Sequence, residues 1–229
     1  MNIAVFGTGI VGQTIAARLS SLGHRVTIGT RDSKKTLAKK EPDRYGNPPM
    51  REWLTQHDGI DLDDYAKSVI DAELVFNCTL GSASVEALRL AGPAINGKIL
   101  VDVANPLDFS NGMPPTLSPG NTDSLGELIQ RTFPEVRVVK ALNTMTAAIM
   151  ANPLLIDGDH NVFISGNDAS AKETVQGLLR SFGWREQNIL DLGDITTARG
   201  TEQLLPIWLR LWGKFQTPFF NFNIVRKSS

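Results

Sequence analysis

The sequence predicts a doubly wound α/β fold, in which helices cover both faces of a mostly parallel sheet and a small C-terminal lobe follows. Two observations predict this fold. An apolar strand at the N-terminus leads directly into a glycine-rich loop and a segment with helical periodicity. Further short, β-branched runs then alternate with helical stretches along most of the chain, as in parallel sheets that are buried on both faces.

The glycine-rich loop follows the strand at residues 2–6 and reads Gly7-Thr8-Gly9-Ile10-Val11-Gly12. In such a loop the first glycine permits a tight exit from the strand, the second lets the backbone approach a pyrophosphate, and the third lets the helix pack closely on the sheet. The N-terminus of the helix favours the phosphates, because its N–H groups are unpaired and its dipole is positive there. The motif therefore predicts a Rossmann-type dinucleotide site formed by Gly7, Thr8, Gly9, Ile10, Val11 and Gly12.

The residues after the second expected strand, at 25–29, indicate which dinucleotide binds. An NAD site usually has an acidic residue there that takes the ribose 2′-hydroxyl, whereas this chain has Thr30 and Arg31. A hydroxyl and a guanidinium can hydrogen-bond a 2′-phosphate and neutralise its charge, so NADP is favoured. Two alternatives remain open: Asp32 could turn toward the ribose, and the basic run from Arg31 to Lys40 could be a solvated surface.

The remaining elements define the expected domains. The stretch from 32 to 71 is expected to hold helices at 32–40, 50–56 and 63–68, with an insertion at about 41–70. Further strands are expected at 72–78, 99–104, 136–141, 160–165 and 189–192, and a helix at 169–182. We therefore expect an NADP-binding domain over residues 1–145 and a smaller C-terminal lobe over residues 146–229.

Polar residues follow three of the expected strands. Ligands of open α/β sheets bind outside the carboxyl ends of the strands, so these residues are expected to surround the nicotinamide. The candidates are Thr79, Leu80, Asn105, Pro106, Leu142, Asn143 and Thr144. For each one alone, a turn at Asn105-Pro106 or a helix cap at Asn143-Thr144 explains the residue equally well, whereas a site explains the set better.

No catalytic acid–base group and no metal site is predicted. His24, His57 and His160 lie where structural or surface roles are expected, and no pair of them has metal-ligand spacing. Cys78, the single cysteine, lies in an apolar strand and is expected to be a buried core residue. The chemistry is therefore expected to belong to the cofactors.

Composition is typical of a cytoplasmic enzyme. The net charge of −1 implies neither a nucleic-acid partner nor an anionic membrane surface, and no apolar segment is long enough to span a bilayer. The N-terminus has no signal-peptide pattern, and a single cysteine fits a reducing compartment. A small-molecule redox cofactor or substrate is the expected partner.

The C-terminal segment is rich in aromatic residues at helical spacing. This apolar face is expected to form a helix that residues 217–222 continue; its members are Leu204, Leu205, Ile207, Trp208, Leu211, Trp212 and Phe215. Such a face is most often core. Because it follows a complete doubly wound domain, we expect it to cover the cofactor cleft and to form a homodimer interface.

Several motifs together resemble a known family. They are the glycine loop, Thr30-Arg31, Asp102-Val103-Ala104-Asn105-Pro106, the segment Val139-Lys140-Ala141-Leu142-Asn143-Thr144-Met145, and the tail from Arg199 to Arg210. Nearly end to end, the chain resembles the NADPH-dependent reductases of the deazaflavin coenzyme F420, and also the oxidoreductase domain of the STEAP ferric reductases. The resemblance implies that Thr30, Arg31 and Lys35 hold the 2′-phosphate, and that a hydride passes between NADPH and F420. The insertion departs from the compact archaeal reductases.

Other functions remain open. The chain could reduce a flavin, a ferric chelate or a small carbonyl or imine with NADPH, or it could be a non-catalytic NADP sensor. Hydroxyacid dehydrogenases and imine reductases of the same superfamily use a helical Lys-x-x-x-Asn pair. Here Lys140 and Asn143 are three residues apart and Lys140 is expected in a strand, which argues against that class.

Overall fold

The computed structural model describes residues 1–42 and 46–227. Positions 43–45, within the expected insertion, and 228–229 lie outside the described residues. The central sheet has eight strands: β1 (Asn2–Phe6), β2 (Arg25–Thr30), β3 (Ile60–Asp64), β4 (Leu74–Asn77), β5 (Ile99–Asp102), β8 (Arg137–Ala141), β9 (Val162–Gly166) and β10 (Ile189–Asp191).

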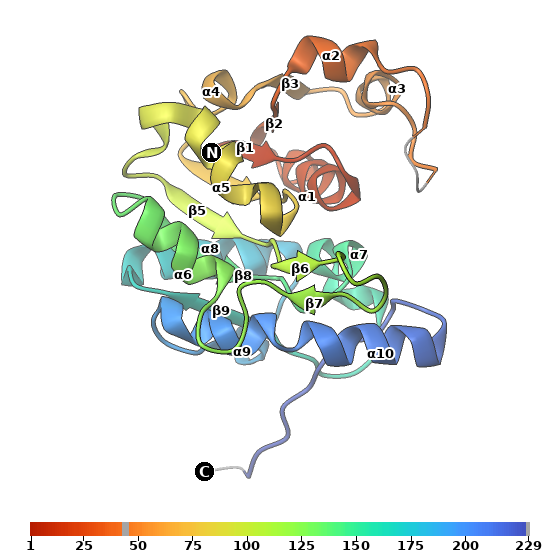
Figure 1. The fold of residues 1–229 in the computed structure, drawn as a ribbon, viewed down its shortest axis with the longest axis vertical. Helices are drawn as coiled ribbons and strands as arrows, with labels where there is room; N and C mark the ends of the chain where they lie inside the picture. Colours follow the sequence, from red (N-terminus) through yellow and green to blue (C-terminus); the bar gives the residue numbers. More distant parts are fainter. Residues whose placement is uncertain (43–45, 228–229) are drawn as a thin grey trace.

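The strand order is β10-β9-β8-β5-β4-β1-β2-β3. Neighbouring strands are parallel except for β8 and β9, which pair in opposite directions. From β3 to β8 the order is the one typical of dinucleotide-binding folds, with β1 and β4 at the point where the order reverses. The predicted doubly wound, mostly parallel fold is confirmed, and β9 and β10 extend the same sheet beyond residue 146 (Figure 1).

Helices cover both faces of this sheet. They are α1 (Ile10–Ser21), α2 (Ser33–Ala38), α3 (Met50–Thr55), α4 (Tyr65–Ser68), α5 (Gly81–Ala91), α6 (Leu125–Thr132), α7 (Ala147–Ala151), α8 (Ala169–Phe182), α9 (Ala198–Glu202) and α10 (Leu205–Phe215). Short 3₁₀ turns lie at Gly92–Ile95, Pro153–Leu155, Glu186–Asn188 and Ile195–Thr197. Two short antiparallel strands, β6 (Leu107–Asp108) and β7 (Thr116–Leu117), form a separate hairpin.

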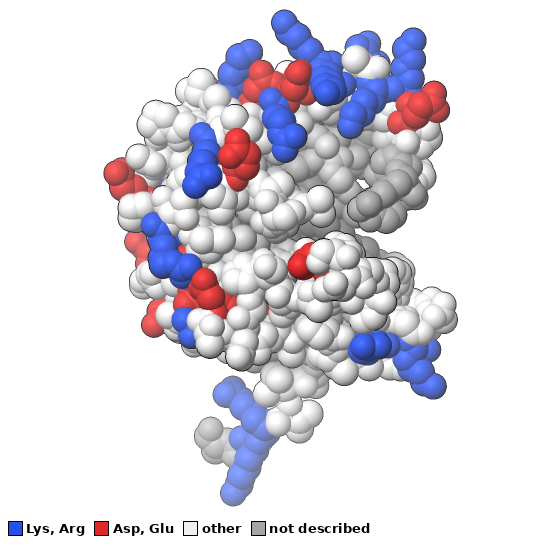
Figure 2. All heavy atoms as spheres, viewed as in Figure 1, with Lys and Arg blue, Asp and Glu red and all other residues white. Residues whose placement is uncertain are grey.

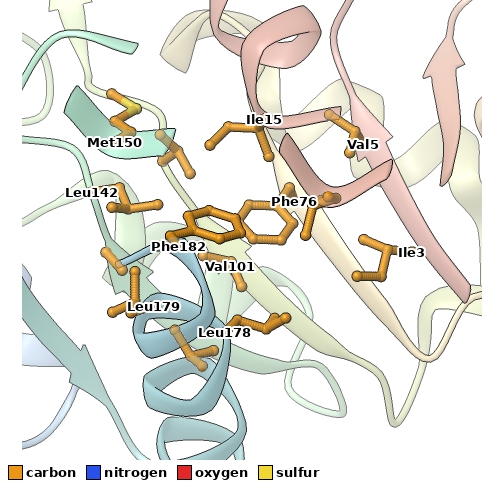
Figure 3. Close-up of a cluster of buried hydrophobic side chains, with 14 of the residues drawn as sticks. Ile3, Val5, Ile15, Phe76, Val101, Leu142, Met150, Leu178, Leu179 and Phe182 are labelled. Atoms are coloured by element: carbon orange, nitrogen blue, oxygen red, sulfur yellow. The ribbon is translucent and has the colours of Figure 1, made fainter. Parts of the chain in front are cut away.

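Alternate residues of the central strands enter two separate cores. On β1, Ile3 and Val5 pack with α1, α3, α7 and α8, whereas Ala4 and Phe6 pack on the other face with α5, α6 and α9. In the first core, Phe182 of α8 points toward Phe76 of the sheet (Figure 3). The central strands are therefore buried on both faces, which explains their continuous apolar sequences.

The segment at 60–64 is a strand that the sequence did not predict. It pairs in parallel with β2, from Val26 opposite Ile60 to Thr30 opposite Asp64. The predicted helix at 63–68 is therefore wrong at its start, and helix α4 begins at Tyr65. Acidic residues have low strand propensity, and three of the five residues of β3 are aspartates, so pairing with β2 determines the conformation.

The predicted helical continuation at residues 217–222 is also wrong. Helix α10 ends at Phe215, and the next residue, Gln216, has a φ of 55° that turns the chain out of the helix. Phe220 folds back against Trp208, with ring centroids 5.3 Å apart. Within the described residues, none of the helices combines the length and the apolar character needed to cross a membrane.

Candidate functional site

The glycine loop leaves an open approach at the N-terminus of α1. Gly7 has a φ of 121°, and a Cβ there would lie 2.6 Å from the Cys78 carbonyl oxygen. A Cβ on Gly12 would lie 2.0 Å from the Gly7 carbonyl oxygen, whereas a Cβ on Gly9 would meet nothing within 4 Å. Gly9 is also the N-cap of α1 and provides no capping side chain. The loop is therefore closely packed beneath and open above, where a pyrophosphate would approach the helix amides.

The end of β2, where the adenosine end of a dinucleotide is expected, combines paired hydroxyls with an aspartate that caps α2. The Thr30 hydroxyl lies 3.1 Å from the Thr36 hydroxyl, and Thr30 is buried at the end of β2. The Asp32 carboxylate accepts a hydrogen bond of 2.8 Å from the backbone N–H of Lys35 and caps α2. Its side chain is thus engaged by its own helix rather than turned toward a ribose. Arg31 is exposed.

A cleft of about 390 Å³ lies between the glycine loop and α2. Its lining includes Thr8, Gly9, Gln13, Thr36, Lys39, Lys40, Glu41, Pro42, Pro48, Pro49 and Met50. Lys35, the lysine expected at the phosphate, does not line this cleft, whereas Lys39 and Lys40 do. In the sequence, the basic run from Arg31 to Lys40 is the feature that could have indicated Lys39 and Lys40. Basic side chains gather over α2 and α3 at this end of the molecule (Figure 2).

A second pocket, of about 290 Å³, lies at the carboxyl ends of β4, β5 and β8. Its lining comprises Val11, Cys78, Thr79, Leu80, Gly81, Ser82, Val103, Ala104, Asn105, Leu107, Phe109, Asn143, Met145, Met150, Leu205 and Trp208. Val11 belongs both to the glycine-rich motif and to the first turn of α1, so this pocket adjoins the loop. A dinucleotide that lies along the loop would reach this pocket with its nicotinamide end.

Two asparagines link the strand ends in this pocket. The Asn105 amide donates to the Asn143 carbonyl oxygen at 2.8 Å, and the Asn143 amide donates to the Asn105 side-chain oxygen at 3.0 Å. Leu142 precedes Asn143 with a φ of 65°, a left-handed conformation that costs a non-glycine residue on the order of 1–3 kcal/mol. This turn at the end of β8 brings Asn143 opposite Asn105.

The structure brings together only some of the predicted strand-end residues. Thr79, Leu80, Asn105 and Asn143 line the pocket, whereas Pro106, Leu142 and Thr144 do not. Leu142 and Thr144 are each only 1% exposed, and Leu142 points into the core shown in Figure 3. The unusual turn at Leu142 reverses which side chains face the cleft, and nothing in the sequence indicates that turn.

Further residues line the pocket beside these strand-end candidates. A Cβ on Gly81 would lie 2.1 Å from the Asn105 carbonyl oxygen, so a glycine is needed for α5 to begin against this strand end. Leu107 and Phe109 come from the β6–β7 hairpin, and Met145 and Met150 come from the segment after β8. The aromatic tail, which was expected to cover the cleft, contributes Leu205 and Trp208 to the lining.

A chain of buried hydrogen bonds runs beneath the pocket. The Thr79 hydroxyl donates to the Asn77 side-chain oxygen at 2.7 Å, and the Asn77 amide donates to Asp102 at 2.8 Å. The Lys140 ammonium lies 2.8 Å from Asp102 and 2.7 Å from Glu202. Burial opposes the charge of Lys140, but the two carboxylates outweigh it and raise the pKa of its ammonium.

The described lining of this pocket contains no histidine. The His57 ring stacks on Trp53 with centroids 3.9 Å apart, and His160 lies 3.0 Å from the Pro153 carbonyl oxygen. In the described chain no group of three or more His, Cys, Asp or Glu side chains could hold a metal ion. Cys78, expected to be a buried core residue, is partly buried against the core and also lines the pocket, and burial of its thiol raises its pKa.

Comparison with known proteins places the chain in a family. Residues 2–106 match the family described as NADP oxidoreductase, coenzyme F420-dependent. A crystal structure of a candidate F420-dependent NADP reductase from Arthrobacter sp. FB24 is 58% identical, with a TM-score of 0.93, and the match covers 99% of this chain and 100% of that one. The F420-dependent NADP reductase of Methanothermobacter marburgensis is 26% identical over 92% of both chains.

The metalloreductase STEAP3 of Rattus norvegicus is also similar. It is 29% identical over 98% of this chain, and the chain spans 42% of the length of that relative. Taken with the fold and the glycine loop, these matches confirm the resemblance that the sequence motifs predict. The chain is an NADP-dependent oxidoreductase and belongs to the coenzyme F420-dependent NADP oxidoreductase family.

Proposed function

We propose that the chain transfers a hydride between NADPH and coenzyme F420, with both reacting rings in the 290 Å³ pocket at the ends of β4, β5 and β8. The family supports an oxidoreductase of this kind. In this proposal NADPH supplies the hydride from C4 of its nicotinamide, and the deazaflavin accepts it at C5. The residues of the chain hold the two rings face to face.

NADP fits the residues at the loop and at α2. The space above Gly9 and the uncapped N-terminus of α1 suit a pyrophosphate, and Thr30, Arg31 and Lys35 are the proposed partners of the 2′-phosphate. We add Thr36, Lys39 and Lys40 to these partners, because they line the cleft beside the loop. Because the Asp32 carboxylate caps α2, it is not directed toward a ribose 2′-hydroxyl, which favours NADP over NAD.

The observation that carries the proposal is the chemistry of the pocket lining. Among the described residues that line it, there is no carboxylate, lysine, arginine or histidine. Leu80, Leu107 and Trp208 provide apolar surface, and Asn105 and Asn143 provide amide groups at its edge. A ketone or imine reductase needs a group that gives a proton to the substrate, whereas hydride transfer between two flat cofactors depends on proximity and orientation.

A second candidate is the reduction of a flavin or ferric chelate. The match to STEAP3 over 98% of this chain favours it, and a flavin is as flat as a deazaflavin. Reduction of a small carbonyl or imine, and a non-catalytic NADP sensor, are the remaining alternatives.

The test is to mix the purified protein with NADPH and, in separate reactions, coenzyme F420, FMN, a ferric chelate, and small ketones and imines. NADPH absorbance then reports oxidation. The proposal predicts fast oxidation with F420. Oxidation with only ketones or imines would contradict it, oxidation with FMN or ferric chelate alone would favour the second candidate, and oxidation with none would favour a sensor.

We also propose that the protein works in the cytoplasm as a homodimer. Trp212 and Phe215 on α10 and Phe219 after it are 43%, 53% and 49% exposed, which is unusual for such large apolar side chains. Light scattering coupled to size-exclusion chromatography tests this, because a dimer has twice the chain mass of 25.0 kDa.

A further inference from the structure

We propose that Glu202, acting through Lys140, is a positioning residue. It fixes the aromatic wall of the pocket, formed by Leu205 and Trp208, relative to the floor of the pocket at Ala104 and Asn105. This inference rests on the proposed function only in taking this pocket as the place of the nicotinamide. It concerns the Asp102–Lys140–Glu202 cluster, which lies beneath the pocket and does not line it.

Lys140 connects the floor of the pocket to α9. Its side chain is completely buried, and its ammonium bonds to Asp102, Glu202 and the carbonyl oxygen of Ala104. An ammonium has three N–H donors, so these three acceptors satisfy it. Ala104 lines the pocket, and Asp102 also accepts a hydrogen bond from the Ala104 N–H. Both the N–H and the carbonyl oxygen of Ala104, in the floor of the pocket, are therefore hydrogen-bonded to the cluster.

Glu202 is also hydrogen-bonded to the backbone at the start of α6. Its carboxylate accepts hydrogen bonds of 2.9 Å and 3.1 Å from the N–H groups of Leu125 and Gly126, at the start of α6. The ammonium of Lys140 is its third hydrogen-bond donor. Burial, together with the nearby charge of Asp102, raises the pKa of Glu202, although the charge of Lys140 opposes that effect.

The position of Glu202 links this cluster to the aromatic wall of the pocket. Glu202 is the last residue of α9, and α10 begins three residues later at Leu205. Leu205 and Trp208 line the pocket together with Ala104 and Asn105. A displacement of Glu202 would therefore move the aromatic wall relative to the floor.

Stability alone is a weak reason for such a cluster. Burying charges carries a large desolvation cost, and well-packed apolar residues of similar volume often stabilise a fold equally well or better. A buried ion pair does fix one geometry. Hydride transfer needs one geometry, since a misplacement of about 1 Å can reduce a rate by roughly a hundredfold.

Arg199 offers a matched control on the same helix. It also ties α9 to α6, through hydrogen bonds to Glu127, one of which is 2.7 Å long. Arg199 neither lines the pocket nor contacts Lys140. If Glu202 only attached α9 to α6, losing either residue would have the same effect.

The experiment compares Glu202→Gln and Arg199→Gln with the unchanged protein. Two ligands are titrated: NADPH, which has the nicotinamide, and 2′,5′-ADP, which has only the adenosine end. Glu202→Gln is expected to weaken NADPH roughly tenfold and to leave 2′,5′-ADP unchanged, because only the nicotinamide end depends on the pocket wall. Arg199→Gln is expected to leave both affinities unchanged.

Equal weakening of both ligands by Glu202→Gln, or no weakening of NADPH, would overturn the inference, and so would the same selective loss in Arg199→Gln. If Glu202→Gln does not fold, Glu202→Asp keeps the charge beside Lys140 but retracts it by one methylene, and the same selective loss is expected. These titrations need no acceptor. The absence of F420 reduction by the unchanged protein would therefore refute the proposed function without deciding the role of Glu202.

Discussion

Asn105 and Asn143 hydrogen-bond each other in both directions across the ends of β5 and β8, at 2.8 Å and 3.0 Å. Both line the pocket that is the proposed place of hydride transfer. The pair therefore links the two strand ends at the pocket.

Asn143→Ala removes one side of this pair. We expect the rate of NADPH oxidation with coenzyme F420 to fall roughly tenfold or more, because the pocket loses a polar edge and its fixed width. Affinity for 2′,5′-ADP should not change. Asn152→Ala is the control, since Asn152 caps a 3₁₀ turn and does not line the pocket. If the rate fell by the same factor in Asn152→Ala, the effect of Asn143→Ala would not be specific to the pocket.

Arg31→Ala tests the adenosine end. The substitution should weaken NADPH much more than NADH, because it removes a cation beside the 2′-phosphate. Direct titration of both cofactors measures the two affinities. Lys67→Ala removes a different exposed cation, which pairs with Asp63 at 3.6 Å, and should change neither affinity. Equal losses for NADPH and NADH in Arg31→Ala would show that Arg31 does not contact the phosphate.

Gly9→Ala and Gly12→Ala should fail in different ways. A Cβ at Gly9 meets no protein atom within 4 Å, so this variant should keep its melting temperature and lose NADPH affinity. A Cβ at Gly12 would lie 2.0 Å from the Gly7 carbonyl oxygen, so that variant should be strongly destabilised. Thermal unfolding and NADPH titration separate the two effects. A loss of stability in Gly9→Ala would contradict the open space around a Cβ at Gly9.

The sequence was sufficient where local patterns determine the structure. The glycine loop, the alternation of strands and helices, and the helix at 169–182 follow from steric needs and apolar periodicity, and the structure has them. Strand β3 could not be predicted, because its aspartates favour other conformations and only the pairing with β2 makes it a strand.

The site was predictable to a similar extent. Thr79, Leu80, Asn105 and Asn143 line the pocket because strand ends of a parallel sheet meet at one edge. Leu142 does not, because its left-handed backbone conformation turns its side chain into the core. The contact between Lys140 and Glu202 joins residues 62 positions apart, and no periodicity in the sequence indicates it.

Stability should depend on pH through Glu127. Hydrogen bonds from Arg199 hold the pKa of Glu127 below its ordinary value of 4.5. This contribution is therefore present above that ordinary pKa and is lost as the pH falls through the lower folded value. Urea unfolding at about pH 7 and about pH 3 should show a smaller difference in Glu127→Gln than in the unchanged protein. Glu86→Gln, at an exposed pair 4.0 Å from Arg89, should leave the difference as it was.

The proposed reaction is direct hydride transfer between two cofactors, in a pocket whose described lining has no carboxylate, lysine, arginine or histidine. Single-turnover reaction of coenzyme F420 with NADPH deuterated at the transferred C4 position, followed by mass spectrometry, tests it. The predicted result is reduced F420 that carries one deuterium from NADPH. Reduced F420 without deuterium, or no reduction of F420 at all, would contradict the account.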